Sequence, residues 1–181
     1  DLIQRRLRDI QIATLNDFGE MARVSLTAGQ LSVSLWNSGG WGTPLPIVTA
    51  SPVLAFGEVV QNNFGVLAIE AQVALGDSTA TRVVVWDREG TVQIIGENLS
   101  WTSVTDLRIT DSGFVAARAI LSNTTEAIFR WRAGQMLTLP GSGAVKFKGL
   151  SERGEILDET RGLYRAGQWD AAAVGAFALG P

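Results

Sequence analysis

The chain has 181 residues, a formal net charge of -3, 46% hydrophobic residues and 18% charged residues. This composition excludes a disordered tail, and the small negative charge gives no general attraction to nucleic acid or to an anionic membrane. The chain contains no cysteine and no histidine, which excludes disulfides, thiolate metal sites and the commonest general base of enzymes.

The first eight residues, 1–8, form a separate N-terminal segment in our prediction. They contain the only basic cluster of the chain, Arg5, Arg6 and Arg8, which we interpret as solvated. Apolar residues at positions 2, 3 and 7 suit a short amphipathic helix or an outer strand of an adjacent unit. Because the chain begins at Asp1 without a signal-peptide pattern, it is either a processed form or a piece of a longer polypeptide. No segment reaches the roughly 18 to 20 apolar residues of a membrane span, so we expect no membrane insertion.

A polar turn motif recurs along the chain and predicts a repeat. In each copy a polar pair is followed one residue later by glycine, as in Asn16-Asp17-Phe18-Gly19, and the other copies end at Gly65, Gly113 and, more weakly, Gly154. These glycines lie 46, 48 and 41 residues apart, each between two apolar runs. Asn or Asp bonds its own backbone to start a turn, and glycine takes the positive φ that closes a hairpin. We therefore expect Gly19, Gly65 and Gly113 at positive φ in hairpins.

A second motif follows each of these glycines. An aromatic residue ends an apolar strand, and another polar turn with glycine comes next; the aromatic residues are Trp36, Trp86, Trp131 and Tyr164. The turns after the last two share the tetrapeptide Arg-Ala-Gly-Gln, at 132–135 and 165–168. Because the two motifs keep register with each other, they indicate one repeated unit of four short strands.

The repeat predicts an all-β fold. Four-stranded units that recur every 40 to 50 residues or so are typical of propeller blades, in which neighbouring blades cover each other's faces. We predict a β-propeller-like array of four four-stranded antiparallel blades, at about residues 9–53, 54–100, 101–143 and 144–181, within a single domain over residues 9–181. In the third unit we expect strands at about 103–110, 114–121, 126–132 and 135–139. A two-sheet β-sandwich with an accidental repeat is the alternative.

The chain resembles the propeller repeats of bacterial secreted and surface proteins. The residues that carry the resemblance are Leu15-Asn16-Asp17-Phe18-Gly19, an alternating strand, and then Leu35-Trp36-Asn37 with Gly39. They match the "IND-x-G … LW-x-x-G" pattern of HAF repeats, and the likeness to kelch repeats is looser. The resemblance covers nearly the whole chain but is specific only at the turn and the aromatic residue. It implies a propeller fold and an extracellular or cell-surface location, and it implies no chemistry.

Three residues are candidates for a binding role. Glu58 and Asp106 share one repeat position, seven residues before the turn glycine on the innermost expected strand. Two carboxylates across a cavity suit a glycosidase, although a polar channel lining is the plainer interpretation. Trp101 lies outside both repeated aromatic positions, and its flat indole suits stacking on a ligand. The tryptophans at the repeated positions are interpreted as packing residues: Trp36, Trp86, Trp131, Trp41 and Trp169.

These observations favour a non-enzymatic binding module of a secreted or cell-surface protein, in contact with a protein or a glycan. The alternatives are a carbohydrate-active enzyme that uses channel carboxylates and an architectural subunit of a larger ring or filament. No turn has the alternating carboxylate spacing of a calcium loop, so we expect neither a metal nor a cofactor. We also expect no nucleic-acid partner.

The two ends of a four-blade array predict assembly. We expect an open face on the first blade with Ile10 and Met21, and one on the last blade with Ile156 and Tyr164. Exposed apolar faces of that size call for a partner. Either the four blades close on themselves, or the chain associates with copies of itself or with other chains; we favour association.

Overall fold

The computed structural model describes residues 11–140 and 145–171. Within these ranges every regular element is a β-strand, and none of the described residues forms a helix that could cross a membrane. The chain divides into two compact units, Asp1–Ser100 and Trp101–Pro181, each treated separately below. The predicted segment 1–8 lies outside the described residues, and the single domain over residues 9–181 stays a prediction.

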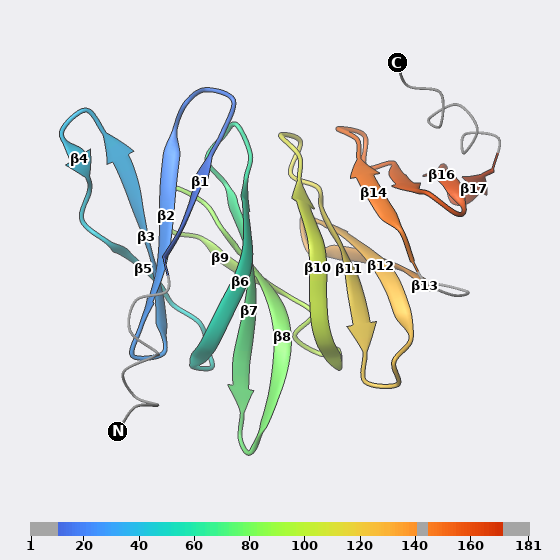
Figure 1. Cartoon of the computed structure of the whole chain (residues 1–181), viewed down its shortest axis with the longest axis horizontal. Helices are drawn as coiled ribbons and strands as arrows, with labels where there is room; N and C mark the ends of the chain where they lie inside the picture. Colours follow the sequence, from blue (N-terminus) through green and yellow to red (C-terminus); the bar gives the residue numbers. More distant parts are fainter. Residues whose placement is uncertain (1–10, 141–144, 172–181) are drawn as a thin grey trace. The chain divides into compact units, whose positions relative to one another are not determined.

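The first unit contains two antiparallel sheets (Figure 1). The first sheet has the order β1-β2-β3-β4, and β5 also pairs with β3. Its strands are β1 (Gln11–Leu15), β2 (Met21–Thr27), β3 (Gln30–Asn37), β4 (Gly40–Trp41) and β5 (Leu45–Ile47). The second sheet has the order β6-β7-β8-β9. Its strands are β6 (Val53–Gln61), β7 (Leu67–Leu75), β8 (Ser78–Trp86) and β9 (Val92–Ile95).

The second unit also contains two antiparallel sheets, each a meander of four consecutive strands. The third sheet consists of β10 (Trp101–Ile109), β11 (Val115–Leu121), β12 (Glu126–Arg132) and β13 (Gln135–Pro140). The fourth sheet consists of β14 (Phe147–Leu150), β15 (Ile156–Asp158), β16 (Gly162–Arg165) and β17 (Gln168–Asp170). The predictions of an all-β chain and of four antiparallel sheets with four strand positions each are therefore confirmed for the described residues.

The repeated polar turns have one geometry. In the first copy Asn16 Oδ1 accepts hydrogen bonds from the backbone N–H groups of Phe18 (3.1 Å) and Glu20 (2.9 Å), and the Gly19 N–H donates to the Asn16 carbonyl (3.0 Å). The backbone φ of Gly19 is 78°. The same bonds recur at Asn62, where Oδ1 bonds the second and fourth residues after it. The positive φ expected for the turn glycines is confirmed at all three positions, 78°, 77° and 82°.

In the third and fourth sheets the second turn of the repeat is a two-residue hairpin loop. The shared tetrapeptide places Ala133 at φ 47° and Gly134 at φ 81°, and it places Ala166 at φ 49° and Gly167 at φ 89°. Two successive residues with positive φ characterise a type I′ turn, whose twist matches that of the strands it joins. The identical tetrapeptides therefore form the same turn twice.

Each unit holds an apolar core between its two sheets. In the first unit the facing residues include Val24, Leu31 and Val33 of the first sheet and Leu67 and Trp86 of the second. In the second unit the core joins the third and fourth sheets through the following residues: Ala116, Ile128, Leu139, Val145, Phe147, Ile156 and Tyr164. Each sheet thus lends one face to a core.

The predicted open face of the last sheet is wrong. Ile156 and Tyr164 are buried, at 0% and 8% exposure, because the face that carries them packs on the third sheet. They are cross-strand partners, so they point to the same side of the sheet. Met21 of the first sheet is half-buried, and Ile10 lies outside the described residues.

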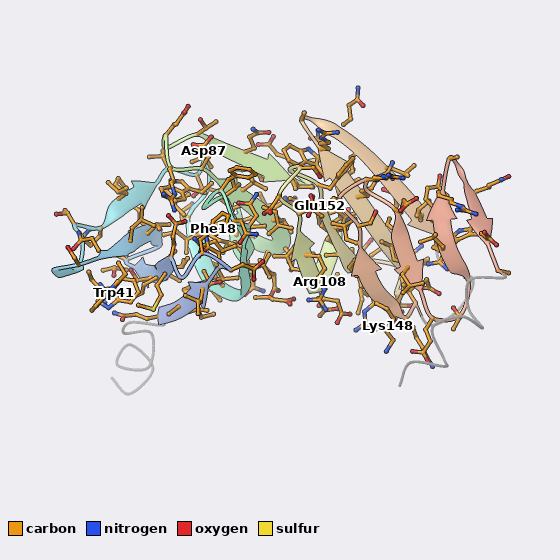
Figure 2. The ribbon with its side chains drawn as sticks, turned by 90° about the horizontal axis from the view of Figure 1, so that it is seen from above. Phe18, Trp41, Asp87, Arg108, Lys148 and Glu152 are labelled. Atoms are coloured by element: carbon orange, nitrogen blue, oxygen red, sulfur yellow. The ribbon has the colours of Figure 1, made fainter. Side chains whose placement is uncertain are left out.

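The first turns of neighbouring sheets are hydrogen-bonded to each other within each unit. In the first unit Asp17 N–H donates to Asn63 Oδ1 (2.9 Å), and Asn63 Nδ2 donates back to Asp17 Oδ2 (3.1 Å). In the second unit the Glu152 carboxylate, labelled in Figure 2, accepts from the N–H groups of Asp111 (3.1 Å) and Ser112 (2.8 Å). The turns therefore hold the ends of two stacked sheets in register.

Candidate binding surface

One cross-strand row of side chains recurs in all four sheets, beside the first turn. The register of the strands places these residues level with one another. The rows are Leu15, Met21, Trp36 and Trp41; Gln61, Leu67, Trp86 and Val92; Ile109, Val115, Trp131 and Met136; and Leu150, Ile156, Tyr164 and Trp169. Each row contains the repeated strand aromatic, and residues directly across a sheet share one face. We call the first of them the Trp36 row.

The Trp36 row is open where its counterparts are covered. Trp86 is 1% exposed in the core shared with the first sheet, and Tyr164 is 8% exposed in the core shared with the third sheet. Trp36 is 46% exposed and Leu15 is 63% exposed. The interpretation of Trp36 as a packing residue is therefore wrong, whereas it is confirmed for Trp86. The difference arises because, in the second and fourth sheets, a preceding sheet of the same unit covers this face.

The Trp36 ring is held in place by its neighbours. Trp36 and Trp41 are cross-strand partners, with ring centroids 5.4 Å apart and planes 80° apart, an edge-to-face contact. The Arg23 guanidinium lies 4.6 Å from the centroid of Trp41, which Figure 2 labels on the first sheet. Tyr164 and Trp169 repeat this edge-to-face pair in the fourth sheet. The exposed indole is thus a rigid projection rather than a loose side chain.

A hollow opens beside Trp36 because the outer strand of the first sheet is broken. β4 pairs only with Trp36 and Asn37, and β5 pairs with Leu31 to Val33, so residues 42–44 leave the edge of β3 between them. One hydrogen bond, from Gly42 N–H to the Leu35 carbonyl (2.9 Å), bridges the break. The hollow has a volume of about 400 Å³ and is lined by Glu20, Met21, Leu35, Trp36, Asn37, Gly42, Thr43, Leu45 and Arg88.

An ion pair forms the polar border of this hollow. Arg88, from the β8–β9 turn of the second sheet, bonds the Glu20 carboxylate of the first sheet, and Asn16 Nδ2 donates to the same oxygen (2.8 Å). The hydrogen bond from Arg88, followed by that from Asn16, lowers the pKa of Glu20 below its usual value. The border therefore stays ionised near neutral pH, and the surface combines an apolar row with a polar rim, as interface patches do.

Trp101, the first candidate from the sequence, lies in the packing of the second unit. Its side chain is 2% exposed, and its ring stacks on Phe129 with centroids 4.6 Å apart and planes 21° apart. A ligand reaches this indole only if that packing opens. The ligand-binding role of Trp101 stays a prediction.

Glu58, the second candidate, lies beside another carboxylate. β6 has an irregular register between Phe56 and Val59, and within it the Glu58 N–H donates to Glu70 Oε2 (3.2 Å). Burial raises the pKa of Glu70, and the charge of Glu58 raises it further, against the lowering effect of that hydrogen bond. Neither carboxylate lines the hollow at Trp36.

Asp106, the third candidate, lies in a bulge of β10 and has a φ of 58°. Its Oδ2 is 3.4 Å from Nε of Arg118, which also donates to Thr105 Oγ1 (3.0 Å). Glu58 and Asp106 belong to different units and have different neighbours. Glu58 lies beside the carboxylate of Glu70, and Asp106 lies beside the guanidinium of Arg118. The binding roles of Glu58 and Asp106 stay predictions.

The sequence interpretation missed the openness of Trp36 and the neighbour of Glu58. Glu70 was recognisable by alignment, because it follows Gly65 by five residues just as Arg118 follows Gly113. Trp36 carried no such signal, since its own repeat position is the same as that of the buried Trp86. Comparison of the chain with known protein families and with curated proteins gave no match. The candidate surface is therefore argued from its own geometry.

Proposed function

We propose that the chain is a non-enzymatic protein-binding module whose contact surface is the Trp36 row. The observation that supports this most directly is the contrast between equivalent rows. The second and fourth rows are each covered by a sheet of the same unit, and the first row is the one left with an exposed indole. The repeat thus favours another antiparallel sheet with an apolar face as the occupant.

We propose a second copy of the chain as the source of that sheet. In the first unit the face that covers the Trp86 row consists of small and branched residues of the first sheet, among them Ala22, Val24 and Val33. In an associating copy, the face of the fourth sheet that carries the half-buried Leu157 and Leu163 would pack on Trp36 as the first sheet packs on Trp86. Burying one large apolar side chain contributes about 1.5 to 3 kcal/mol, and aromatic residues at the centre of an interface contribute more than their share.

Sedimentation at micromolar concentration tests this proposal. We expect the wild-type chain to sediment as a multiple of its 19.3 kDa mass, and Trp36→Glu to sediment as the single chain. Phe18→Glu is the matched control, because Phe18 is 73% exposed at a turn and lies outside the row. A wild-type monomer whose Trp36 remains accessible to a fluorescence quencher would refute the proposal. A wild-type monomer in which the quencher cannot reach Trp36 would indicate a ring closed within the chain and would also exclude the second copy.

We further propose that the four sheets are blades of a β-propeller in a secreted or cell-surface protein. The support is the equivalence of the four rows and the resemblance of the turn and aromatic motifs to HAF repeats. Within each unit the inner strands also stack alike: β6 lies against β1 and β2, and β14 lies against β10 and β11. Electron microscopy of the purified particle tests the fold, because a propeller gives a ring of radial lobes and stacked sandwiches do not.

The second candidate function is a carbohydrate-active enzyme, which the Glu58 and Glu70 pair favours. Burial raises the pKa of the Glu70 carboxyl, and a carboxyl group with a raised pKa beside a second carboxyl group is the usual arrangement in glycoside hydrolysis. Incubation of the wild type and of Glu70→Gln with a panel of polysaccharides tests it. Release of reducing sugar by the wild type and its loss in the variant would support an enzyme; absence of turnover by the wild type would remove this candidate.

A further inference from the structure

Two arginines of the third sheet, Arg130 and Arg132, lie on one face of β12. Arg130 and Arg132 flank Trp131, so both point away from its row. No carboxylate of the described residues forms an ion pair with either guanidinium. Like charges two residues apart on a strand face repel each other, and an unpaired pair of this kind is unfavourable unless an anion neutralises it.

A phenyl ring is wedged between these arginines and the neighbouring turn. The Arg132 guanidinium carbon lies 4.7 Å from the centroid of Phe114, and that of Arg130 lies 5.6 Å from it. Arg130 Nη1 also donates to the Gly154 carbonyl (2.5 Å). A Cβ at Gly154 would collide with the Phe114 ring, so the glycine leaves room for the ring. Both guanidinium groups are thereby oriented over one aromatic side chain.

These residues line a hollow of about 530 Å³ on the second unit. Its lining consists of Phe114, Arg130, Arg132, Ala133, Gln135, Met136 and Leu137. Arg132 and Gln135 are cross-strand partners, and so are Arg130 and Leu137. Met136 is the cross-strand partner of Trp131, so its side chain points to the other face of the sheet. The wall therefore presents two planar cationic groups and one amide beside an apolar surface made by Phe114 and Leu137.

We propose that this hollow binds an anionic sugar, with its carboxylate or sulfate group on Arg130 and Arg132. A guanidinium presents a planar fork of donors that matches an oxyanion, and it is the usual side chain where such groups are recognised. The apolar side chain of Leu137, together with the part of Phe114 that lines the hollow, suits the apolar face of a pyranose ring, and the Gln135 amide suits its hydroxyl groups. This site belongs to the second unit, and it is independent of the association proposed for the Trp36 row.

The counterparts of Arg132 in the other repeats explain why the site is confined to the third sheet. They are Asn37, Asp87 and Arg165. Arg165 is already paired, because its Nη2 donates to Asp170 Oδ2 (2.8 Å). Arg165 is therefore a matched control for Arg132: it has the same residue type and the same repeat position, but its charge is neutralised.

Titration calorimetry and proton–nitrogen NMR of the full chain test the proposal with four probes. The probes are an oligogalacturonate, a sulfated N-acetylglucosamine, a neutral cello-oligosaccharide and inorganic sulfate. We expect binding of at least one anionic sugar, with shifts of the Arg132 and Gln135 amide signals, and no binding of the neutral one. The probe that binds distinguishes carboxylate from sulfate. Arg132→Gln should weaken this binding about tenfold or more, and Arg165→Gln should leave it unchanged.

Several results would overturn the proposal. These are no binding of any anionic sugar at millimolar concentration, equal binding of the neutral oligosaccharide, equal binding of inorganic sulfate, or unchanged affinity in Arg132→Gln. Equal binding of inorganic sulfate would mean that the arginines hold any small anion without recognising a sugar. Arg132 is an exposed side chain, so its variant should keep the wild-type melting temperature; Gln135→Ala provides a second substitution in the same wall should that temperature fall.

Discussion

Asp158 is a fully buried carboxylate that holds the shortest sheet together. It ends β15, and its Oδ1 accepts from Thr160 N–H (2.9 Å), Thr160 Oγ1 (2.6 Å) and Arg161 N–H (3.0 Å). Its Oδ2 accepts from Lys146 N–H (3.1 Å) and Arg161 Nη2 (3.2 Å). Burial alone would raise the pKa of Asp158, but the hydrogen bonds from Thr160 and Arg161 outweigh it, so the pKa lies below its ordinary value of 3.8.

Asp158→Asn should destabilise the fourth sheet by about 3 to 6 kcal/mol. An asparagine whose oxygen takes the place of Oδ1 keeps three hydrogen bonds, but its amide group then faces two donors, Lys146 N–H and Arg161 Nη2. The variant loses two bonds to the ionised carboxylate, each of which contributes about 1.5 to 3 kcal/mol. Removing one member of a buried ion pair costs a similar amount, about 3 to 5 kcal/mol.

Urea unfolding followed by circular dichroism, with hydrogen exchange of the Thr160 and Arg161 amides, measures this effect. Because the folded pKa of Asp158 is depressed, its contribution is fully present above pH 3.8 and is lost as the pH falls through the folded pKa. The difference between wild type and Asp158→Asn should therefore be largest near neutral pH and shrink in acid. Glu159→Gln, at the exposed neighbour, is the control and should unfold like the wild type. An Asp158→Asn midpoint equal to that of the wild type at pH 7 would refute this reasoning.

Two further predictions concern the first unit. Gly65→Ala should destabilise the protein by about 1 to 2 kcal/mol, because Gly65 has a φ of 77°. The loss should exceed that of Gly113→Ala, because a Cβ at Gly65 also displaces the Arg88 guanidinium, whereas a Cβ at Gly113 has open space. Equal urea midpoints for the two variants would contradict this prediction. Glu70→Gln should raise the melting temperature at pH 7, because burial and then the charge of Glu58 raise the folded pKa of Glu70 above its ordinary 4.5. A group with a raised folded pKa stabilises the protein below its unfolded pKa and loses that stability as the pH rises through the folded pKa. The higher melting temperature of Glu70→Gln should therefore disappear below about pH 4.5. A lower melting temperature of the variant at pH 7 would show that the hydrogen bond from the Glu58 N–H outweighs the cost of burying the charge of Glu70.

The turns and strands of this chain were predictable because their causes are local. An asparagine that bonds its own backbone and a glycine at positive φ lie within four residues of each other, as in Asn16 to Gly19. The shared Arg-Ala-Gly-Gln tetrapeptide likewise forms its type I′ turn from two adjacent residues. In the third sheet the strands expected at 114–121 and 126–132 are found at Val115–Leu121 and Glu126–Arg132.

The candidate surfaces were not predictable in the same way, because their environments depend on which sheet lies in front. Trp36 and Trp86 share a repeat position, yet one is exposed and the other is buried. Tyr164 was expected on an open face and lies in a core, because the position of a sheet in the array decides which of its faces is covered. Alternation along β12 is enough to predict that Arg130 and Arg132 point to the same face of the sheet. The significance of this arginine pair emerged once the contacts with Phe114 and the absence of a counterion among the described residues were known.

The equivalent rows give the stacking of sheets a direction. In the second and fourth sheets the aromatic row packs on the sheet that precedes it in the same unit. The row of the first sheet carries an exposed indole, whereas Trp131 in the third row is 8% exposed, so the Trp36 row is the free end of such a series in our proposal. Its complement is the opposite face of a last sheet, here the face of the fourth sheet that carries the half-buried Leu157 and Leu163. Contact between these two different faces is heterologous, and repeated heterologous contacts form either a closed ring or an open filament. A two-copy ring therefore requires the rotation between successive sheets to sum to one full turn over eight sheets; a ring of another copy number requires another rotation, and a rotation that never closes leaves a Trp36 row exposed at one end of a filament.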